Sequence, residues 1–206
     1  MFQTVEEESK YELTEKKSNF IASLMYVQNK EMAENKIREF KKKFHDARHN
    51  CSAYRVIEDD IVYEKVNDDG EPSGTAGLPM LNILQKKNLC NVIIIVTRYF
   101  GGILLGTGGL VRCYSDATIG AVENAKKILM KEGIEFEVEI GYNYIDHFKY
   151  YCRTQNIKII DAIYSDKIIF NVEADDSTYK IFIEDVKNKK IEVINIKEIG
   201  KRYIKI

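Results

Sequence analysis

The sequence has little net charge, few cysteines and no long apolar run. Lysine and arginine number 31 against 32 aspartates and glutamates, which gives a formal net charge of −1 at pH 7. Such a chain has no overall electrostatic attraction to nucleic acid or acidic membranes, so any such binding must come from a local patch. No apolar run approaches membrane-spanning length, and the acidic N-terminus lacks an apolar signal segment. We therefore expect a soluble cytoplasmic protein.

The cysteines are scattered and include no CxxC pair: Cys51, Cys90, Cys113 and Cys152. This pattern is typical of reduced thiols in the cytoplasm. His45, His49 and Cys51 supply at most three zinc ligands, and their spacing matches no closed structural site. A catalytic pair of His49 and Cys51 is an alternative, because residues i and i+2 share one face of a strand. Cysteines in strand cores are usually inert, however. We expect no metal site from these residues.

Apolar residues are concentrated in one uninterrupted run, Val92–Val96, which predicts a strand buried on both faces. Arg98 and Tyr99 follow this strand, and apolar residues recur at helical spacing from Leu110 onward. Between the two lie five glycines within nine residues: Gly101, Gly102, Gly106, Gly108 and Gly109. The sequence therefore predicts a buried strand, a glycine-rich loop and a helix.

The glycine-rich loop has features of an anion-binding site. Thr107 is expected to cap the helix, which leaves the amides of residues 108–110 free at the positive end of the helix dipole. Arg98 and Arg112 are expected to flank a bound anion. The loop has neither the G-K-[ST] of a Walker loop nor the GxGxxG spacing of a dinucleotide site. Tight packing of the helix against the strand explains the glycines about as well as phosphate binding does.

Two polar segments precede this unit. Asp46, Arg48 and His49 are expected to cluster at the mouth of a strand. The loop 67–80 holds both prolines of the chain and brings three carboxylates and a hydroxyl together: Asp68, Asp69, Glu71 and Thr75. A solvated turn is the simplest interpretation. Alternatively, the carboxylates face Arg98 or hold Mg²⁺ beside a phosphate. Apart from that Mg²⁺, we expect no cofactor.

Periodicity predicts the remaining elements. The first part should contain a strand pair over 11–27 that turns at 15–19, a helix over 30–44, a hairpin formed by a strand from 51 and its partner 61–66, and a helix over 78–87. The second part should contain strands at 135–140, 157–164 and 168–172, helices around 144–152 and 179–186, and a last strand over 191–199 that extends, in one alternative, through Ile206. This βαββαβ order is ferredoxin-like.

Three segments resemble the signature segments of the IMPACT/YigZ family: DARHNCSAY (46–54), DDGEPSGTAGLPML (68–81) and RYFGGILLGTGGLVRCY (98–114). The resemblance covers about residues 1–130 and is closest to the bacterial branch. It implies an α+β protein of two domains. Residues 1–130 would form a domain related to a ribosomal-protein domain and to domain IV of elongation factor G, and residues 134–206 a ferredoxin-like domain. Eukaryotic members regulate translation through a kinase pathway that senses uncharged tRNA, and they use an additional RWD domain. This chain starts directly at the IMPACT domain, so we do not carry over that partner role.

Three functions remain open. The first is a non-catalytic, translation-linked regulator that binds RNA, the ribosome or a translation factor through exposed basic residues: Arg48, Lys86, Lys87, Arg98 and Arg112. The second is an enzyme acting on a phosphorylated small molecule held by the glycine-rich loop, with Asp69 and Glu71 as metal ligands or acid/base groups and His49 moving protons. The third is packing without a ligand. The resemblance favours the first, without deciding whether the protein is catalytic.

Overall fold

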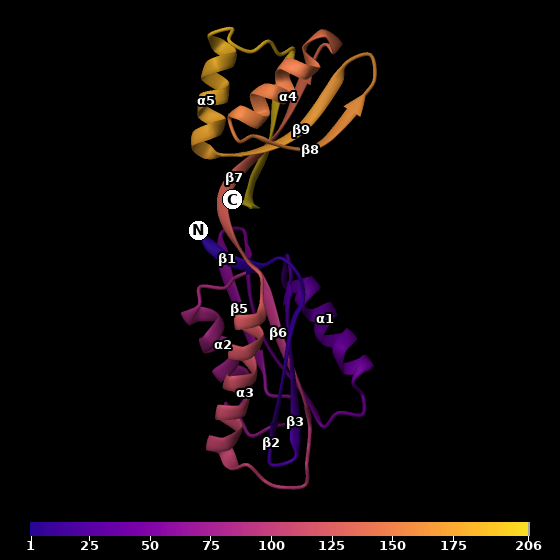
Figure 1. The fold of residues 1–206 in the computed structure, drawn as a ribbon, viewed down its shortest axis with the longest axis vertical. Coiled ribbons are helices and arrows are strands. Elements are labelled where there is room, and N and C mark those ends of the chain that lie inside the picture. Colours follow the sequence, from indigo (N-terminus) through magenta and orange to yellow (C-terminus); the bar gives the residue numbers. More distant parts are fainter. Residues whose placement is uncertain (206) are drawn as a thin grey trace. The chain divides into compact units, whose positions relative to one another are not determined.

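The computed structural model describes residues 1–205, and these divide into two compact units (Figure 1). The first unit comprises Phe2–Leu129, and the second comprises Met1 and the chain from Met130 onward. Within the described residues the chain forms five α-helices and two β-sheets. The expected mixed α/β architecture with two domains is therefore confirmed. None of the helices in residues 1–205 is long and apolar enough to cross a membrane.

The first unit is built on an antiparallel sheet with β6 at its centre. The strand order is β2-β3-β6-β4-β5, with β2 at Ser9–Glu15, β3 at Ser18–Tyr26, β6 at Val92–Tyr99, β4 at His49–Glu58 and β5 at Ile61–Asn67. A short strand that the sequence analysis missed, β1 (Phe2–Val5), lies beside the segment before β6, because the Cys90 amide donates to the Gln3 carbonyl at 2.8 Å. The hairpins predicted at 15–19 and between 51 and 66 are confirmed.

Helices cover both faces of this sheet (Figure 1). Helices α2 (Gly77–Lys86) and α3 (Gly106–Asn124) pack on one face, and α1 (Lys30–Lys43) packs on the other. Strand β6 serves both cores, since Ile94 faces α2 and α3 whereas Ile93 and Ile95 join the α1 core. All three are at most 1% exposed. The prediction of a strand buried on both faces is confirmed, and each such side chain contributes roughly 1.5–3 kcal/mol.

The second unit has the ferredoxin-like order. Its elements are β7 (Lys127–Ile140), the short 3₁₀ helix η1 (Tyr142–Tyr144), α4 (Ile145–Thr154), β8 (Lys158–Tyr164), β9 (Ile168–Asp175), α5 (Asp176–Lys187) and β10 (Asn195–Lys205). The strands pair antiparallel in the order β10-β7-β9-β8. Four phenylalanines, each at most 1% exposed, fill its core: Phe136, Phe148, Phe170 and Phe182. The βαββαβ prediction is confirmed.

Strand boundaries differ from the prediction by a few residues in several places, and most at β7 and β10. Strand β7 begins at Lys127, not near 135. The last strand was expected over 191–199, but β10 begins at Asn195 and continues to Lys205. The reason is that the chain still turns at the end of α5, where the Lys190 amide donates to the Asp185 carbonyl at 2.9 Å. Ile191 is buried through packing against the core and not through strand pairing. Ile206, the end of the alternative extension, lies outside the described residues.

Candidate functional site

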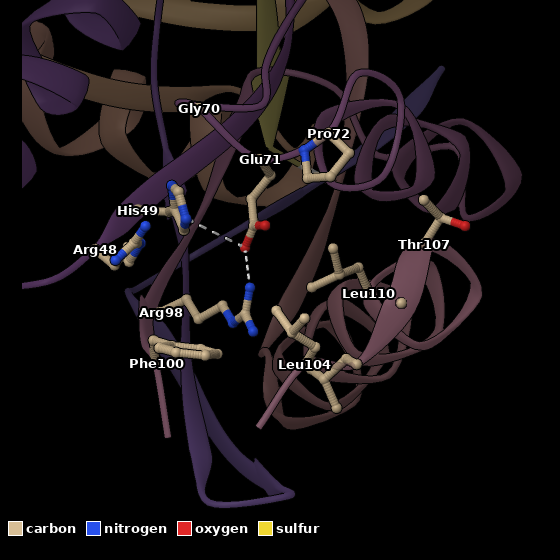
Figure 2. Close-up of a pocket in the computed structure, with 12 residues that line it drawn as sticks. Arg48, His49, Gly70, Glu71, Pro72, Arg98, Phe100, Leu104, Thr107 and Leu110 are labelled. Atoms are coloured by element: carbon tan, nitrogen blue, oxygen red, sulfur yellow. Dashed lines mark hydrogen bonds and ion pairs between the residues drawn. The ribbon is translucent and has the colours of Figure 1, made fainter. Parts of the chain in front are cut away.

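A cavity of about 400 Å³ lies in the first unit, and all three segments that carry the family resemblance line it (Figure 2). The start of β4 contributes Arg48 and His49, the 67–80 loop contributes residues 70–72, and the end of β6 with the start of α3 contributes the rest. The sheet register explains part of this convergence, since His49 pairs directly with Arg98 on the neighbouring strand. Segments about fifty residues apart in the sequence therefore meet at one end of the sheet.

The floor of the cavity holds a buried ion pair. Arg98 Nη1 lies 2.5 Å from Glu71 Oε1, and the two residues are only 4% and 8% exposed. The Tyr114 hydroxyl, on α3, donates to the same Glu71 oxygen at 2.9 Å. Burial, with the neighbouring Cys51 thiol and the Glu71 carboxylate, raises the pKa of Tyr114. Tyr114 therefore stays protonated and acts as a donor. The expectation that the acidic loop faces Arg98 holds for Glu71.

His49 is held beside this ion pair in a defined orientation. Its Nδ1 lies 2.8 Å from the Asp69 carbonyl oxygen, and its Nε2 lies 3.8 Å from Glu71 Oε1 (Figure 2). A carbonyl oxygen can only accept, so Nδ1 must carry a proton. In the neutral ring Nε2 then presents its lone pair near Glu71. The arrangement can accept a proton or a hydrogen bond from a group in the cavity.

The other two carboxylates of the loop, Asp68 and Asp69, accept hydrogen bonds from backbone amides. Asp68 accepts hydrogen bonds from the amides of Gly74, Ala76 and Gly77, at 2.7–3.0 Å, and so shapes the entry to α2. Asp69 accepts from the Asn50 amide at 2.6 Å and pairs with Lys41 at 2.5 Å. Because buried amides need acceptors, these roles explain both residues without a ligand.

Thr75 is the remaining polar residue of this loop, and Mg²⁺ was the alternative partner for the loop carboxylates. Thr75 is buried, and its hydroxyl donates to the Pro72 carbonyl at 2.6 Å. No group of three or more histidines, cysteines, aspartates and glutamates among residues 1–205 could hold a metal ion together. Asp69 and Glu71 thus point to different partners, and neither lies in a ready cluster of ligands.

The mouth of the cavity pairs a cation with an aromatic ring. Arg48 is exposed, and its guanidinium carbon lies 5.8 Å from the centre of the Phe100 ring, which is 40% exposed. Asp46 lies outside the cavity lining and accepts from the Tyr99 hydroxyl at 3.1 Å. Lost solvation, together with this bond, raises the pKa of Tyr99. Asp46 therefore anchors the end of β6, and Arg48 is the accessible charge.

The start of α3 forms the opposite wall and differs from the prediction. The helix begins at Gly106, and its N-cap is Leu105, whose side chain makes no capping hydrogen bond; the expected cap at Thr107 is wrong. Thr107 lies within the first turn because Gly106, at φ +72°, already turns the chain into the helix. With no side chain of residues 1–205 capping this end, the first amides of α3 are open to a ligand.

The glycines of the loop have separate roles. A Cβ on Gly101 would lie 2.0 Å from the Lys17 backbone, so this glycine allows close packing against the β2–β3 turn. Gly102 and Gly106 adopt left-handed conformations, and a Cβ on Gly109 would lie 3.1 Å from Leu105. Gly108 has neither a left-handed φ nor any atom within 4 Å of its Cβ position. Packing explains some of these glycines but not Gly108.

Arg112 does not flank the cavity with Arg98, as the sequence analysis expected. Its side chain is 84% exposed, pairs with Asp116 at 3.5 Å, and borders a separate hollow. Arg112 follows Thr107 by five residues on α3, and this spacing turns it to another side of the helix. Lys86 and Lys87, at the end of α2, also lie outside the cavity lining. Of the expected basic residues, only Arg48 and Arg98 line it, and Arg98 is buried against Glu71, not exposed as the sequence analysis expected.

Cys51 is not placed as a nucleophile. It is fully buried, and its thiol donates to the Asp68 carbonyl at 3.0 Å and lies 3.3 Å from the Tyr114 hydroxyl. Burial raises the pKa of the Cys51 thiol far above its ordinary value, so the reactive thiolate does not form near neutral pH. His49 is turned to Asp69 and Glu71 instead. The alternative of a His49–Cys51 catalytic pair is therefore wrong.

The sequence offers Tyr99 and Phe100 as at most one stacking platform, but it does not predict the leucines in the apolar part of the cavity. Phe100, Leu104, Leu105 and Leu110 line it, and Leu104 is 83% exposed. In the sequence these residues resemble ordinary core positions beside glycines. The only signal was an aromatic residue, Phe100, placed directly after the buried strand and before a glycine pair. The arrangement combines an apolar wall, open amides and a paired guanidinium, which suits a ligand with both a flat ring and an anionic group.

Comparisons with known proteins place the chain in a family. The Impact N-terminal domain family matches residues 16–122. The IMPACT family member YvyE of Bacillus subtilis is 36% identical over 187 residues, which cover 88% of this chain and 83% of YvyE. The IMPACT family member YigZ of Escherichia coli is 33% identical over 158 residues, covering 76% of this chain and 78% of YigZ. A crystal structure described only as that of a hypothetical protein is 27% identical, covers 97% of both chains and has a TM-score of 0.65. The chain belongs to the IMPACT family.

Proposed function

We propose that this protein is a cytoplasmic, translation-linked regulator that binds single-stranded RNA at the mouth of the cavity. The observation that carries the proposal is the pairing of exposed Arg48 with exposed Phe100 beside the open amides of α3. Arginine and backbone amides are the groups that contact phosphates, and an exposed aromatic ring can stack a base. The link to translation rests on the family resemblance, whose eukaryotic branch regulates translation.

The overall charge of the chain supports a small, local contact and not a broad one. With a formal net charge of −1, the protein has no general attraction to RNA. Binding must therefore depend on the few groups gathered at the cavity, and its salt dependence should be shallow. A stacked base contributes about 1–3 kcal/mol on this type of platform. We accordingly expect modest affinity for a single strand and weaker binding to a duplex, whose bases are already stacked.

The test is fluorescence anisotropy with a labelled single-stranded RNA at several salt concentrations. We expect Arg48→Ala to weaken binding and to reduce the salt slope by about one contact. Phe100→Ala should weaken binding about five- to 150-fold without changing that slope, since stacking releases no counterions. Arg112→Ala is the matched control, because it removes an exposed arginine of α3 outside the cavity.

Two results would refute the proposal. One is the absence of measurable binding to single-stranded RNA at low salt. The other is an equal loss of binding in the Arg48 and Arg112 variants, since this would mean that RNA contacts the surface without using the cavity. Far-UV circular dichroism of each variant would confirm that it is folded.

A second candidate is an enzyme that acts on a phosphorylated small molecule. The observation that favours it is the position of His49 Nε2, 3.8 Å from buried Glu71 in a cavity of small-molecule size. A histidine so held could accept a proton from a bound hydroxyl. Phosphorus NMR of the protein incubated with phosphorylated metabolites would show conversion, and loss of that conversion in His49→Gln would support this role.

A further inference from the structure

Arg98 has an unused hydrogen-bonding edge. Its Nη1 is taken by Glu71 at 2.5 Å, whereas its Nη2 makes only a long contact of 3.4 Å to Ser18 Oγ. Its Nε is buried and has no hydrogen-bond partner among residues 1–205. Leaving a buried donor unpaired is costly, and Nε with one Nη forms the fork that binds phosphate oxygens. Arg98 is 4% exposed, and its guanidinium ends between Glu71, Phe100 and Leu104 (Figure 2).

The start of α3 supplies further donors to the same cavity. Gly106 and Thr107 line it, and among residues 1–205 no side-chain capping hydrogen bond closes this end of the 19-residue helix. These amides lie at the positive end of the helix dipole, where anions are favoured. Gly108 follows in the same turn with open space where a side chain would stand. Neither backbone conformation nor packing requires glycine there, so a small side chain at this position would meet no neighbouring atom.

The shape of the cavity limits what can enter. Its inner part is lined by buried Glu71, Arg98 and Leu110, while its rim carries the exposed residues Phe100 and Leu104. An RNA end can enter such a cavity from the rim, whereas an internal nucleotide would have to bring the strand in and out again. A volume of about 400 Å³ lies toward the lower end of the range of small-molecule sites, so the occupant must be small.

The donors suit a terminal phosphate. A phosphate monoester carries three terminal oxygens and a charge of about −1.5 to −2 at neutral pH, whereas a phosphodiester within a strand has two free oxygens and one charge. The helix amides and the Arg98 fork approach from different sides, so they suit a group that presents three free oxygens better than a diester that presents two. Because Glu71 neutralises Arg98, the attraction comes from the helix end and from Arg48. The side chain of Leu104 at the rim is 83% exposed, so it can move aside for a ligand with little loss of packing.

We propose that the cavity binds one nucleotide that carries a terminal phosphate monoester. The phosphate lies between the first amides of α3 and the Nε–Nη2 edge of Arg98, and the base lies against Phe100. This inference rests on the proposed RNA-binding function and deepens it by naming the part of the RNA that is recognised, its phosphorylated end. A free nucleoside monophosphate presents the same chemistry, so the experiment must separate the two sources.

The experiment compares four probes by competition against a labelled strand: a short single-stranded RNA with a 5′-phosphate, the same RNA with a 5′-hydroxyl, adenosine 5′-monophosphate and adenosine. We expect each phosphorylated probe to bind about tenfold or more tightly than its unphosphorylated partner, as for the loss of one charge-assisted hydrogen bond. Amide NMR with ¹⁵N-glycine should show shifts at Gly106 and Gly108 on addition of adenosine 5′-monophosphate.

Two variants at one position isolate the amide donor. Gly108→Pro removes an amide proton from the first helical turn, where this amide has no intrahelical partner, and should abolish the preference for phosphate. Gly108→Ala keeps the amide, finds free space for its Cβ and should retain the preference. If Gly108→Pro does not fold, the wild-type probe comparison and the glycine amide shifts still decide the matter.

The outcomes separate this inference from the proposed function. Equal affinity for RNA with either end would overturn the inference and leave RNA binding in place. Tight binding of adenosine 5′-monophosphate without any binding of RNA would support the phosphate site and overturn the RNA-binding function. A preference that persists in Gly108→Pro, without shifts at the α3 glycines, would place the phosphate elsewhere and overturn the inference. Absence of binding by all four probes would overturn both.

Discussion

The buried ion pair between Arg98 and Glu71 should dominate the stability of the cavity floor. We consider Arg98→Met, Glu71→Gln and the double variant. Arg98→Met leaves the Glu71 carboxylate, 8% exposed, with only the Tyr114 hydroxyl and the distant His49 ring as partners. Glu71→Gln keeps an acceptor for Tyr114 but leaves a buried guanidinium charge without its counter-ion. Each single change therefore leaves one buried charge unpaired and should lower the free energy of unfolding.

The magnitude follows from the burial and the distance. Breaking a buried pair by removing one partner costs about 3–5 kcal/mol, because the remaining charge keeps its desolvation penalty. At a separation of 2.5 Å the two groups are directly coupled, so the double variant should lose less than the sum of the single losses. We expect a coupling free energy of at least about 2 kcal/mol. The exposed pair of Arg112 and Asp116 is the control, and Arg112→Met should cost less than about 0.5 kcal/mol.

The assay is urea unfolding followed by far-UV circular dichroism, combined with hydrogen exchange of the β6 amides. Exchange is needed because the two units can unfold separately, and protection of Val92–Val96 reports on the first unit alone. The reasoning would be refuted if Arg98→Met and Arg112→Met lowered the free energy of unfolding of that unit equally. Strictly additive losses in the double variant would also contradict direct coupling of the two charges.

Three further predictions concern other parts of the chain. A hydrogen bond from the Ser177 hydroxyl, then one from the Thr178 amide, lowers the pKa of Asp175, the N-cap of α5, to about 2. Because this value lies below that of the unfolded chain, the stabilisation is present above about pH 4 and is lost as the pH falls toward 2. Asp175→Asn should keep the cap but remove roughly 1–2 kcal/mol of that pH dependence in acid titration of unfolding; an unchanged acid transition would contradict this. Gly101→Ala should destabilise the first unit by more than about 2 kcal/mol, because the added Cβ would overlap the backbone of Lys17. Gly108→Ala, the control, should be neutral or slightly stabilising. Similar unfolding midpoints for the two variants would contradict this prediction. The Cys51 thiol should resist iodoacetamide in the native protein and react after unfolding, as followed by mass spectrometry, and rapid native labelling of Cys51 would disprove its burial.

The spacing of apolar residues in the sequence was sufficient to predict most of the helices and strands. The unbroken run Val92–Val96 could only be a strand covered on both faces, and its residues alternate between two cores as that reading requires. The βαββαβ order of the second unit was also readable, because the apolar spacing changes from two to between three and four at each helix. The predicted boundaries of elements were wrong where local hydrogen bonds determine where an element ends, as at the end of α5. There Ile191 is buried without belonging to a strand.

Less of the candidate site than of the fold could be predicted from the sequence. The sequence alone determined that three polar and glycine-rich segments exist and that one of them starts a helix after a buried strand. Only the tertiary structure decided which side chains share the cavity. Burial and the pairing of β4 with β6 bring His49, Glu71 and Arg98 together, while the turn of α3 carries Arg112 away. Spacing along a chain fixes the face of an element, but the contacts between elements fix which faces meet.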